Sequence, residues 1–356
     1  MIIGLVKETN DPRVALTPAN IGKLATSGVS FLVEEGAGVS AFFPDSEYAA
    51  HATITDRENV IQTSDVLVSV HPLTTTDYKK GSVVIAQFQP YVFKDIASEL
   101  QQQGLVAFSL DMIPRTTLAQ AMDVLSSMAG IAGYQAVLLG AAHLSRFIPM
   151  MVTAAGTVKP SKVLILGAGV AGLQAIATAR RLGATVEAFD TRQAAKEEVQ
   201  SLGAKFVEVE GAVDDRGAGG YAVQQSPEFL AKQRAEVQLR ASKADLVICT
   251  AQVRGNKAPV LLTADTVSQM RPGSVVVDLA ASTGGNCEVT QNDKTIQYHG
   301  VTIIGDSNLA ARMPQDASTL FGNNVAAFLK LFTKNGTLNL DFNNEIISGS
   351  CIAKQS

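Results

Sequence analysis

The segment KVLILGAGVAGLQAIATARRLGATVEAFD, residues 162–190, constrains the fold more than any other part of the chain. Its apolar, β-forming start leads directly into Gly167, Gly169 and Gly172, which have GxGxxG spacing. In this motif the first glycine permits a tight turn, the second lets the backbone approach a pyrophosphate, and the third allows close helix–strand packing. A helical stretch and a second β-rich run follow, and that run ends in Asp190. The order of these features predicts a dinucleotide-binding βαβ unit.

The acid at the end of the second run indicates which dinucleotide is bound. A carboxylate at this position can accept hydrogen bonds from both ribose hydroxyls, and it would repel a 2′-phosphate. Asp190 therefore favours NAD(H) over NADP(H). Arg192 could be argued to hold a phosphate, but next to Asp190 we expect it on the surface or on the adenosine side.

A long polar segment, residues 209–226, follows the third expected strand of this unit. Loops of this length inside a compact domain are uncommon and are often lids. The segment allows two interpretations, a lid in which Tyr221 contacts the nucleotide or a solvated insertion. With the lid included, the expected cofactor contacts are Gly167, Gly169, Val170, Gly172, Asp190, Thr191, Arg192, Gly220, Tyr221, Ala251 and Gln252.

The rest of the chain alternates β-rich runs with helical patterns, which is typical of parallel α/β structure. At 356 residues it exceeds the usual size of one hydrophobic core, so two domains are expected. Thr17 and Pro18 predict the start of a helix that Gly28 can end. The expected strands are residues 2–6, 29–34, 66–70, 83–88 and 105–110, then 163–166, 185–189, 206–209, 246–250, 274–279 and 301–304. We therefore predict an α/β protein of two domains, each a parallel Rossmann-like sheet flanked by helices, joined by a long helix.

The joining helix is expected within residues 116–147, where small residues would let neighbouring helices approach closely. Another helical pattern, residues 315–332, can pack back on the first domain or form a dimer seam, and core packing is the favoured interpretation. The N-terminal domain is then residues 1–125 with 310–356, and the NAD(H)-binding domain is residues 126–309.

Composition excludes several other classes of protein. The net charge of −4 and the pI of about 5.7 give no electrostatic reason to expect nucleic-acid binding. The three cysteines lack CxxC spacing and the four histidines lack metal-ligand spacing, which indicates reduced thiols in a cytosolic protein and no metal site. No secretory signal is found, and His143 and Arg146 interrupt the best membrane candidate, residues 133–158.

Many ordered segments of the chain resemble a single family. They are RVALTP at residues 13–18, EEGAGV at 34–39, PR and AQAMDVLSS within 114–127, TAAGTV at 153–158, GAGVAGLQAIATA at 167–179, FDTR at 189–192, GGYA at 219–222, RPGSVVVDLA at 271–280 and GGNCE at 284–288. This set resembles the NAD(H)-binding component of proton-translocating nicotinamide nucleotide transhydrogenase, in its bacterial form a separate soluble alpha-1 subunit. The likeness runs from about Gly4 to Cys351 and extends to the related alanine dehydrogenases.

The resemblance implies a subunit that binds NAD(H) and exchanges hydride with NADP(H) held on a partner subunit. It also implies membrane-embedded partner subunits that couple the transfer to proton movement, a homodimer, and a cytoplasmic position on the inner face of the cell membrane. The family's Arg, Gln, Asp and Ser near the nicotinamide ring correspond to Arg115, Gln120, Asp123 and Ser126. Members often carry another Arg two positions before this Gln, where this chain has Leu118.

The spacing of these four residues is consistent with that role. Gln120, Asp123 and Ser126 recur every three residues, so on one helix they would lie along a single side. Arg115 enters just before that helix, and together the four groups can orient a nicotinamide carboxamide. Without the resemblance, the residues favour a plainer interpretation, ordinary polar groups on a helix face with Arg115 in a salt bridge.

Two alternative functions stay open. An alanine dehydrogenase must move protons to and from nitrogen, and that family places a Lys, a His and an Asp where this chain has Ser69, Gln87 and Ser282. Arg13, which would hold the amino acid's carboxylate, is present. Hydride transfer between two nicotinamide rings needs positioning rather than acid–base catalysis, so few titratable groups favour transhydrogenation. The other alternative is a non-catalytic NAD-binding module that docks on a partner.

Overall fold

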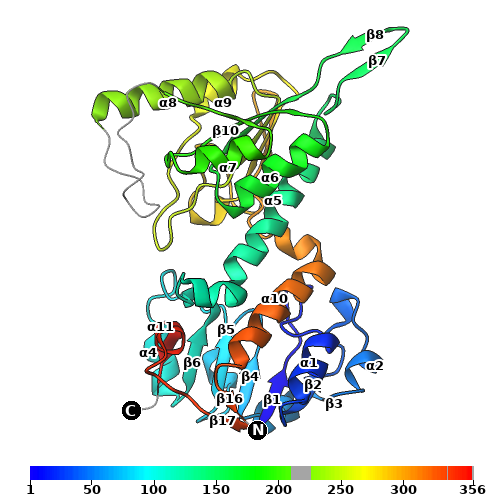
Figure 1. Cartoon of the computed structure of the whole chain (residues 1–356), viewed down its shortest axis with the longest axis vertical. Helices are drawn as coiled ribbons and strands as arrows, with labels where there is room; N and C mark the ends of the chain where they lie inside the picture. The colour runs from blue at the N-terminus through cyan, green and yellow to red at the C-terminus, as the bar shows by residue number, and fades with distance from the viewer. Residues whose placement is uncertain (210–225, 335, 355–356) are drawn as a thin grey trace. The chain divides into compact units, whose positions relative to one another are not determined.

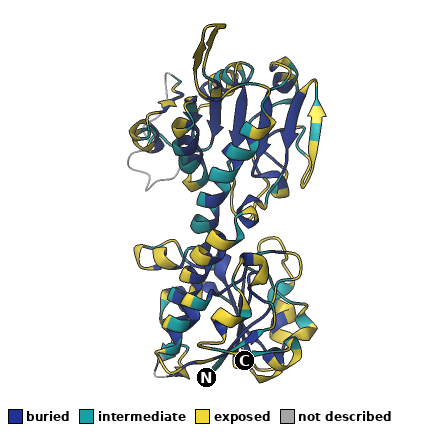
Figure 2. Cartoon of the chain, turned by 90° about the vertical axis from the view of Figure 1, so that its right-hand side faces the viewer, coloured by how far each residue is buried: buried dark blue, intermediate teal, exposed yellow. Residues whose placement is uncertain are grey.

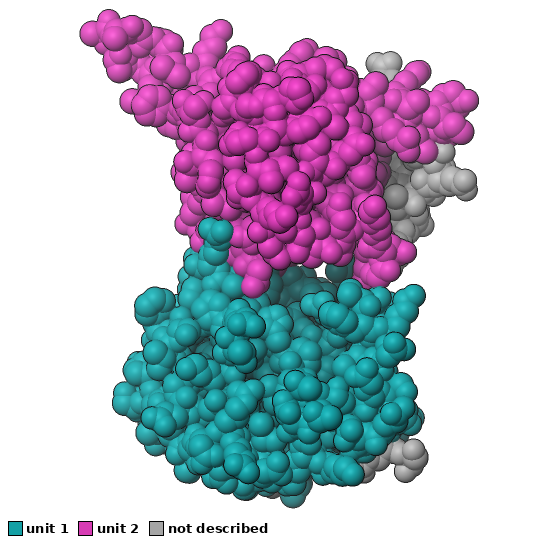
Figure 3. Space-filling view, turned by 180° about the vertical axis from the view of Figure 1, so that it is seen from behind, with its two compact units in different colours: residues 1–128, 310–356 teal, residues 129–309 magenta. Residues whose placement is uncertain are grey.

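The computed structural model describes residues 1–209, 226–334 and 336–354. It divides the chain into two compact units, which Figure 3 shows in different colours. Unit 1 comprises Met1–Met128 and Ala310–Ser356, and unit 2 comprises Ala129–Leu309. The division falls within helix α5 (Val124–His143), so one continuous helix contributes to both units.

The sheet of unit 1 has seven strands in the order β18-β6-β5-β4-β1-β2-β3. Their bounds are β1 (Ile2–Leu5), β2 (Ser30–Glu34), β3 (Thr53–Thr55), β4 (Val66–Val68), β5 (Val83–Ala86), β6 (Val106–Ser109) and β18 (Cys351–Ala353). Neighbours among β1 to β6 are parallel, and β18 runs antiparallel to β6. The five strands predicted for this part of the chain are present, and β3 and β18 add an edge strand on each side.

Helix α1 (Pro18–Ala25) follows β1 as the sequence predicts. Its N-cap Thr17 forms a capping box with Asn20, and Pro18 occupies the first turn. After the helix, Gly28 has a φ of +80° and leads into β2. The other helices and short elements of this part of the chain are η1 (Val39–Ala41), α2 (Asp45–Tyr48), α3 (Arg57–Thr63), η2 (Thr75–Asp77), α4 (Ile96–Gln102), η3 (Leu110–Met112), η4 (Thr117–Met122), η6 (Leu309–Arg312), α10 (Pro314–Leu329), β16 (Thr333–Lys334), β17 (Thr337–Leu338) and α11 (Glu345–Ser350).

Helix α10 belongs to the core of unit 1. It buries Phe321 and Phe328, and Phe332 just beyond its end is fully buried as well. The ring of Phe108 in β6 lies 5.7 Å from that of Phe328 and 5.6 Å from that of Phe332, measured between centroids. These aromatic contacts fix the helix to the sheet. The core-packing interpretation of residues 315–332 is confirmed.

Unit 2 contains a second seven-stranded sheet, in the order β11-β10-β9-β12-β13-β15-β14. Its strands are β9 (Lys162–Leu166), β10 (Thr185–Phe189), β11 (Lys205–Phe206), β12 (Leu246–Cys249), β13 (Val275–Asp278), β14 (Thr295–Tyr298) and β15 (Val301–Ile304). All neighbours are parallel except β14, which pairs antiparallel with β15. Numbered along the chain, the parallel strands have the order 3-2-1-4-5-6, which confirms the predicted doubly wound fold.

The parallel strands of unit 1 have the same order, and each sheet carries its antiparallel strand beside the sixth. In such sheets ligands bind outside the carboxyl ends of the strands, at the point where the order reverses. That point lies between β1 and β4 in unit 1 and between β9 and β12 in unit 2. Each unit therefore has one position for a site, and the residues there decide its use.

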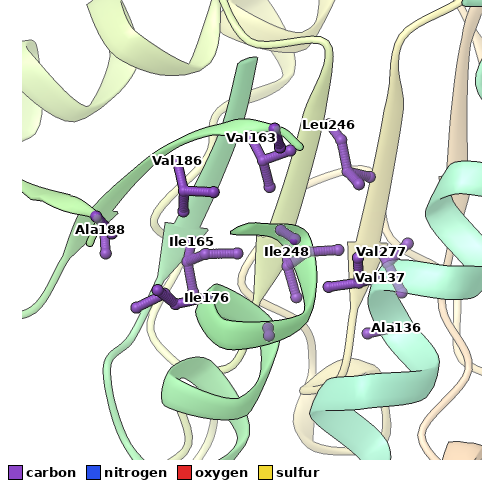
Figure 4. Packing of buried hydrophobic residues seen from close by; sticks show 14 of the residues in the cluster. Ala136, Val137, Val163, Ile165, Ile176, Val186, Ala188, Leu246, Ile248 and Val277 are labelled. Atoms are coloured by element: carbon purple, nitrogen blue, oxygen red, sulfur yellow. The ribbon is translucent and has the colours of Figure 1, made fainter. Parts of the chain in front are cut away.

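Helices cover both faces of the unit 2 sheet. They are α6 (Val170–Arg181), α7 (Ala195–Ser201), α8 (Pro227–Ala241), α9 (Ala264–Gln269), the 3-10 helix η5 (Ala281–Thr283) and the second half of α5. On one face Ile165 packs with Ile176 of α6 and Val137 of α5, as Figure 4 shows. On the other face Leu166 packs with Val237 of α8. The two-residue period of β9 thus feeds two separate cores, and Figure 2 shows its strands as buried.

Helix α5 packs closely on unit 2 because of its small residues. A Cβ on Gly133 would collide with the carbonyl oxygen of Ala171 in α6, and one on Gly140 would lie 2.5 Å from Leu246 Cδ1 in β12. Glycine therefore allows a backbone approach that any larger residue would prevent. By length and composition alone, α5 is the one described helix that would suit a membrane span, although its Val137 is buried in the core of unit 2.

Unit 2 also carries a two-stranded hairpin, β7 (Met151–Thr153) and β8 (Gly156–Val158), labelled in Figure 1. Every residue of both strands is exposed, and Val152 reaches 68% exposure. An isolated two-stranded hairpin is at best marginally stable in water. Exposed apolar side chains on such a hairpin are typical of a contact surface.

Candidate functional site

The glycine turn of unit 2 lies at the carboxyl end of β9, where the strand order reverses. Gly167 has a φ of +104°, which favours glycine, and its N–H donates to Phe189 O of β10 over 2.8 Å. The hydroxyl of Thr250, just after β12, donates to Gly167 O over 3.0 Å, and a Cβ on Gly167 would lie only 2.6 Å from this hydroxyl. Both neighbouring strands therefore hold the turn in place.

The next two glycines serve the helix that follows. A Cβ on Gly172 would overlap the carbonyl oxygen of Gly167, so α6 begins as close to the turn as the motif requires. Gly169 is the N-cap of α6, and no described atom outside its immediate chain neighbours lies within 4 Å of the place its Cβ would take. In the described structure no side chain caps α6, and its first turn, which starts at Val170, contains no acidic residue. The N–H groups and the positive dipole end of this helix suit a phosphate.

Asp190 follows β10 and contacts the glycine turn directly. Its Oδ2 accepts the Ala168 N–H over 2.8 Å and Arg192 Nη2 over 3.0 Å. Its Oδ1 accepts the backbone N–H of Arg192 over 2.8 Å and Nε over 2.9 Å. Burial alone would raise the pKa of Asp190, but these hydrogen bonds outweigh it and lower the pKa. The carboxylate is therefore ionised at neutral pH.

The four donors to Asp190 have a consequence for cofactor binding. A carboxylate offers about four acceptor positions, so those of Asp190 are already in use. Ribose hydroxyls would replace donors of Arg192 rather than add to them. The side chain of Arg192 is 38% exposed, so it can turn away without disturbing the core. Thr191 between the two is exposed and lies at the same edge.

The segment after β12 forms the other side of the glycine turn. Ala251 donates its N–H to Asn286 Oδ1 over 2.9 Å, and its carbonyl accepts from Asn286 Nδ2 over 2.8 Å. Gln252 is exposed, and its Nε2 donates to Leu279 O over 2.8 Å. The N–H of Ala251 is thus committed within the protein. Asn286 carries no local sequence signal for this role, because its partner lies 35 residues away in the chain.

Three other sequence predictions concern this unit. Gly220 and Tyr221, predicted to lie in a lid, are outside the described residues. Cys249 and Cys287 are buried, and burial raises the pKa of Cys287 to about 11, so this thiol is protonated at neutral pH. Within the described ranges, no group of three His, Cys, Asp or Glu side chains could hold a metal ion.

The four-residue cluster lies on the chain of unit 1 and does not lie on one helix. Gln120 belongs to η4, Asp123 has non-helical φ and ψ angles of −76° and 88°, and Ser126 lies in the first turn of α5. Asp123 Oδ1 accepts the Ser126 N–H over 2.9 Å, and Oδ2 accepts the Ser126 hydroxyl over 2.6 Å. Asp123 therefore caps α5, and the prediction of a single helix side was wrong. An aspartate that takes the N–H three residues ahead favours a helix start over a helix interior.

Arg115 and Gln120 have a different environment from Asp123. Both are exposed, and in the part of the chain that the structure describes neither the Arg115 guanidinium nor the Gln120 amide has a hydrogen-bond or ion-pair partner. The salt bridge that the plainer interpretation assigned to Arg115 does not form among these residues. Leu118, at the position where the resemblance departs, is 76% exposed. Two polar groups beside a capped helix start are thus accessible to a ligand.

The reversal point of unit 1 carries a buried ion cluster in place of a glycine turn. Arg13 is 5% exposed and binds Asp11 with two prongs, Nε to Oδ1 over 2.9 Å and Nη2 to Oδ2 over 2.6 Å. His71 Nε2 lies 2.9 Å from the same Oδ2. Burial would raise the pKa of Asp11, but the hydrogen bonds from Arg13 and His71 hold it well below its usual range. The guanidinium that could hold an amino-acid carboxylate is thus neutralised from within.

Two titratable groups at this point had no place in the choice between functions. Glu8 accepts the N–H groups of Val70 and His71 over 2.6 and 3.2 Å, and burial raises the pKa of Glu8 despite these bonds. His71, predicted to be a surface or structural residue, faces Asp11. Ser69 beside them is buried. Because Glu8 and His71 are able to exchange protons, amino-acid oxidation has to be tested directly.

Nearly the whole chain matches two family models. Residues 4–132 match the model described as alanine dehydrogenase/PNT, N-terminal domain, and residues 136–356 match alanine dehydrogenase/PNT, C-terminal domain. The first of the alpha-subunit chains of the NAD(P) transhydrogenase of Rhodospirillum rubrum is 40% identical, with 99% of this chain and 96% of that protein covered.

A solved structure and a more distant enzyme agree with this match. The crystal structure of transhydrogenase from Sinorhizobium meliloti has 41% identity and a TM-score of 0.91, with 99% of each chain covered. The alanine dehydrogenase of Bacillus subtilis is 29% identical, with 91% of this chain and 83% of that protein covered. From its first sheet to its last strand, the chain belongs to the alanine dehydrogenase/PNT family, with higher identity to these transhydrogenases than to this alanine dehydrogenase.

Proposed function

We propose that this chain is the NAD(H)-binding subunit of a proton-translocating NAD(P) transhydrogenase, an oxidoreductase that works with partner subunits. The observation that carries the proposal is Asp190, an ionised carboxylate bonded to Ala168 of the glycine turn. It stands where a dinucleotide bound to this fold presents its adenine ribose, so a 2′-phosphate would meet negative charge. The relative from Rhodospirillum rubrum, aligned along 99% of the chain, is a transhydrogenase alpha subunit, which supports a site that selects one of two nucleotides.

Binding would use groups that unit 2 already presents. The start of α6 offers N–H groups to the pyrophosphate, and Gly169 leaves space for its approach. Asp190 then exchanges donors of Arg192 for ribose hydroxyls. Arg192, released from the carboxylate, stays on the adenosine side. The residues of the site therefore fit NAD(H) without any change in the sheet.

When bound, the nicotinamide ring carries the hydride that is exchanged. The transfer needs no proton at the reacting carbon, so the task of the protein is to orient the ring and exclude water. We assign the carboxamide contacts to Arg115 and Gln120, whose exposed and unpartnered polar groups among the described residues support this role. Asp123, oriented by Ser126, fixes the chain next to them. The hydride acceptor or donor is NADP(H) on the partner subunit.

Amino-acid oxidation is the alternative that the ion cluster of unit 1 favours. It would require Arg13 to leave Asp11 for a substrate carboxylate, with Glu8 or His71 to handle protons. Asp11 is ionised and bound to Arg13 by two prongs, so a second carboxylate would approach negative charge. A non-catalytic NAD-binding module would share the unit 2 site, but it would give the exposed polar groups of Arg115 and Gln120 no task.

One set of measurements separates the three functions. The purified chain should bind NADH in the micromolar range and bind NADPH at least about tenfold more weakly, the equivalent of about 1.4 kcal/mol. Adding the NADP(H)-binding partner should produce fast transfer between NADH and an NAD analogue in the presence of NADP(H). NAD reduction that depends on L-alanine would overturn the proposal in favour of amino-acid oxidation. NADH binding without transfer in the complete mixture would leave only the binding module.

We further propose that membrane-embedded partner subunits hold the chain on the cytoplasmic face of the cell membrane, and that the chain is a homodimer. The hairpin of β7 and β8 supports the second point. Its strands expose Met151, Val152 and Val158, and a ribbon of this size gains stability only when something covers it. A second copy of the chain would supply the same apolar ribbon in return.

Val152→Asp should therefore weaken the dimer by about 100-fold or more, because a two-fold contact buries the new carboxylate twice at a cost of at least about 1.4 kcal/mol each. Analytical ultracentrifugation over a range of concentrations measures the change. Val260→Asp is the matched control, since Val260 is 52% exposed elsewhere in unit 2. A Val152→Asp protein as dimeric as the wild type would place the interface elsewhere.

A further inference from the structure

The loop that follows β12, residues 252–258, is held at both ends by one side chain. Asn286 Nδ2 donates to Ala251 O and to Pro259 O, each over 2.8 Å, and Asn286 Oδ1 accepts the Ala251 N–H over 2.9 Å. Residues 252–257 are all exposed. A single carboxamide therefore joins the residue before the exposed loop to the residue after it.

The position of Asn286 admits no other side chain with the same effect. The residue is fully buried, and its backbone is committed as well: its N–H donates to Asp278 Oδ2, and its carbonyl accepts from Leu261 and Leu262. An aspartate would keep the acceptor but lose both donors, and would place its charge against two carbonyl oxygens. A glutamine would need space for a methylene group that a close-packed interior does not provide.

Asp278 sets where the carboxamide stands. This carboxylate at the end of β13 is fully buried and accepts the N–H groups of Ala280, Asn286 and Cys287 and the hydroxyl of Thr290, over 2.8 to 3.0 Å. The turn between them passes through Gly285, whose φ is +81° and whose Cβ would lie 2.9 Å from Asp278 Oδ2. The end of the neighbouring strand thus anchors Asn286, and Asn286 anchors the loop.

The same contacts continue to the glycine turn. Ala251 follows Thr250, whose hydroxyl donates to Gly167 O. In the strand order β10-β9-β12, Asp190 marks the adenosine side at β10, so a dinucleotide that crosses the turn at β9 brings its nicotinamide half to β12. The 252–258 loop stands at that end of the sheet.

We propose that Asn286 is a positioning residue for hydride transfer, which fixes Ala251 and the 252–258 loop against the nicotinamide half of bound NAD(H). This rests on the proposed function, because it assumes that NAD(H) lies across the glycine turn. Asn286 itself does not contact the cofactor. Its effect falls on the orientation of the nicotinamide and leaves the adenosine half, held by Asp190 and α6, unchanged.

The variant Asn286→Asp tests this division within the full chain and its partner. Affinity for ADP-ribose, which lacks the nicotinamide, should stay within about twofold of the wild type, and affinity for NADH should fall several-fold. The kcat of transfer at saturating NADH should fall on the order of tenfold or more, since small misplacements of reacting groups carry losses of this size. Trypsin should cleave the variant faster after Arg254 or Lys257, both in the loop, and NADH should protect these sites in the wild type.

Gln238→Met is the matched control for a loss of interior hydrogen bonds. The Gln238 carboxamide binds Leu261 O and Thr263 N, on the far side of the same segment and away from Ala251. It should lower Tm without changing kcat or cleavage of the loop. Equal weakening of ADP-ribose and NADH by Asn286→Asp would reduce Asn286 to a structural role and overturn the inference, and so would a wild-type kcat. A wild-type chain that binds no NADH would refute the proposed function itself, while the trypsin assay would still decide whether Asn286 holds the loop.

Discussion

Gly172→Ala is expected to abolish NADH binding, with an affinity at least about 100-fold below that of the wild type. The new Cβ would overlap Gly167 O, and this oxygen cannot retreat because it accepts the hydroxyl of Thr250. The start of α6 must then move away from the turn, which removes the N–H groups that face the pyrophosphate. Forcing a methyl group into a packed site also lowers the free energy of unfolding by about 1–3 kcal/mol.

Fluorescence titration with NADH and thermal unfolding of the same samples measure both effects. Gly130→Ala is the control, because a Cβ there lies 4.0 Å from Val170 Cγ1, an ordinary contact at the same helix. It should keep wild-type affinity and an equal or higher Tm. NADH binding by Gly172→Ala at wild-type strength would mean that the turn does not hold the cofactor.

Asp123→Ala is expected to lower the kcat of hydride transfer by about 100-fold, with NADH affinity changed far less. The substitution removes both hydrogen bonds that tie residue 123 to Ser126, and with them the cap of α5. Loss of such a cap costs about 1 kcal/mol of stability. The chain beside the cap carries Gln120, so its amide would lose its fixed place.

Two further variants separate capping from charge. Asp123→Asn keeps a good N-cap, so a kcat below the wild type at unchanged Tm would assign a role to the carboxylate itself. Asp56→Ala removes the cap of α3, where Asp56 accepts the Asn59 N–H over 2.9 Å, and should leave transfer unaffected. If Asp123→Ala behaved like Asp56→Ala, residue 123 would be a helix cap and nothing more.

The central strands of both sheets were predictable because each is a short run of buried, mostly β-branched residues between polar turns. The strands that escaped prediction are those with little burial. In β14, Thr295 and Gln297 are exposed, and β3 is three residues long with no buried member. An edge strand needs only one hydrogen-bonded neighbour and no buried side, so its sequence carries neither a hydrophobic run nor a clear alternation.

The candidate site divides in the same way. Gly167, Gly172 and Asp190 follow from local chain geometry, and their expected places in the turn are those observed. The helix side predicted for Gln120, Asp123 and Ser126 failed because an aspartate side chain competes with the helix for a backbone N–H. Buried hubs such as Asn286 depend on partners brought together only by the fold, and no spacing in the sequence indicates them.

The assembly of unit 1 from two separate stretches has a consequence for synthesis on the ribosome. Residues 129–309 are contiguous, so unit 2 has its full set of strands once they emerge. Unit 1 must wait for Phe328 and Phe332 to meet Phe108, and for β18 to cover the edge of β6. During that interval the nascent polypeptide exposes an apolar, unpaired sheet margin, the kind of surface that chaperones bind. The earlier half of the protein is therefore the later one to mature.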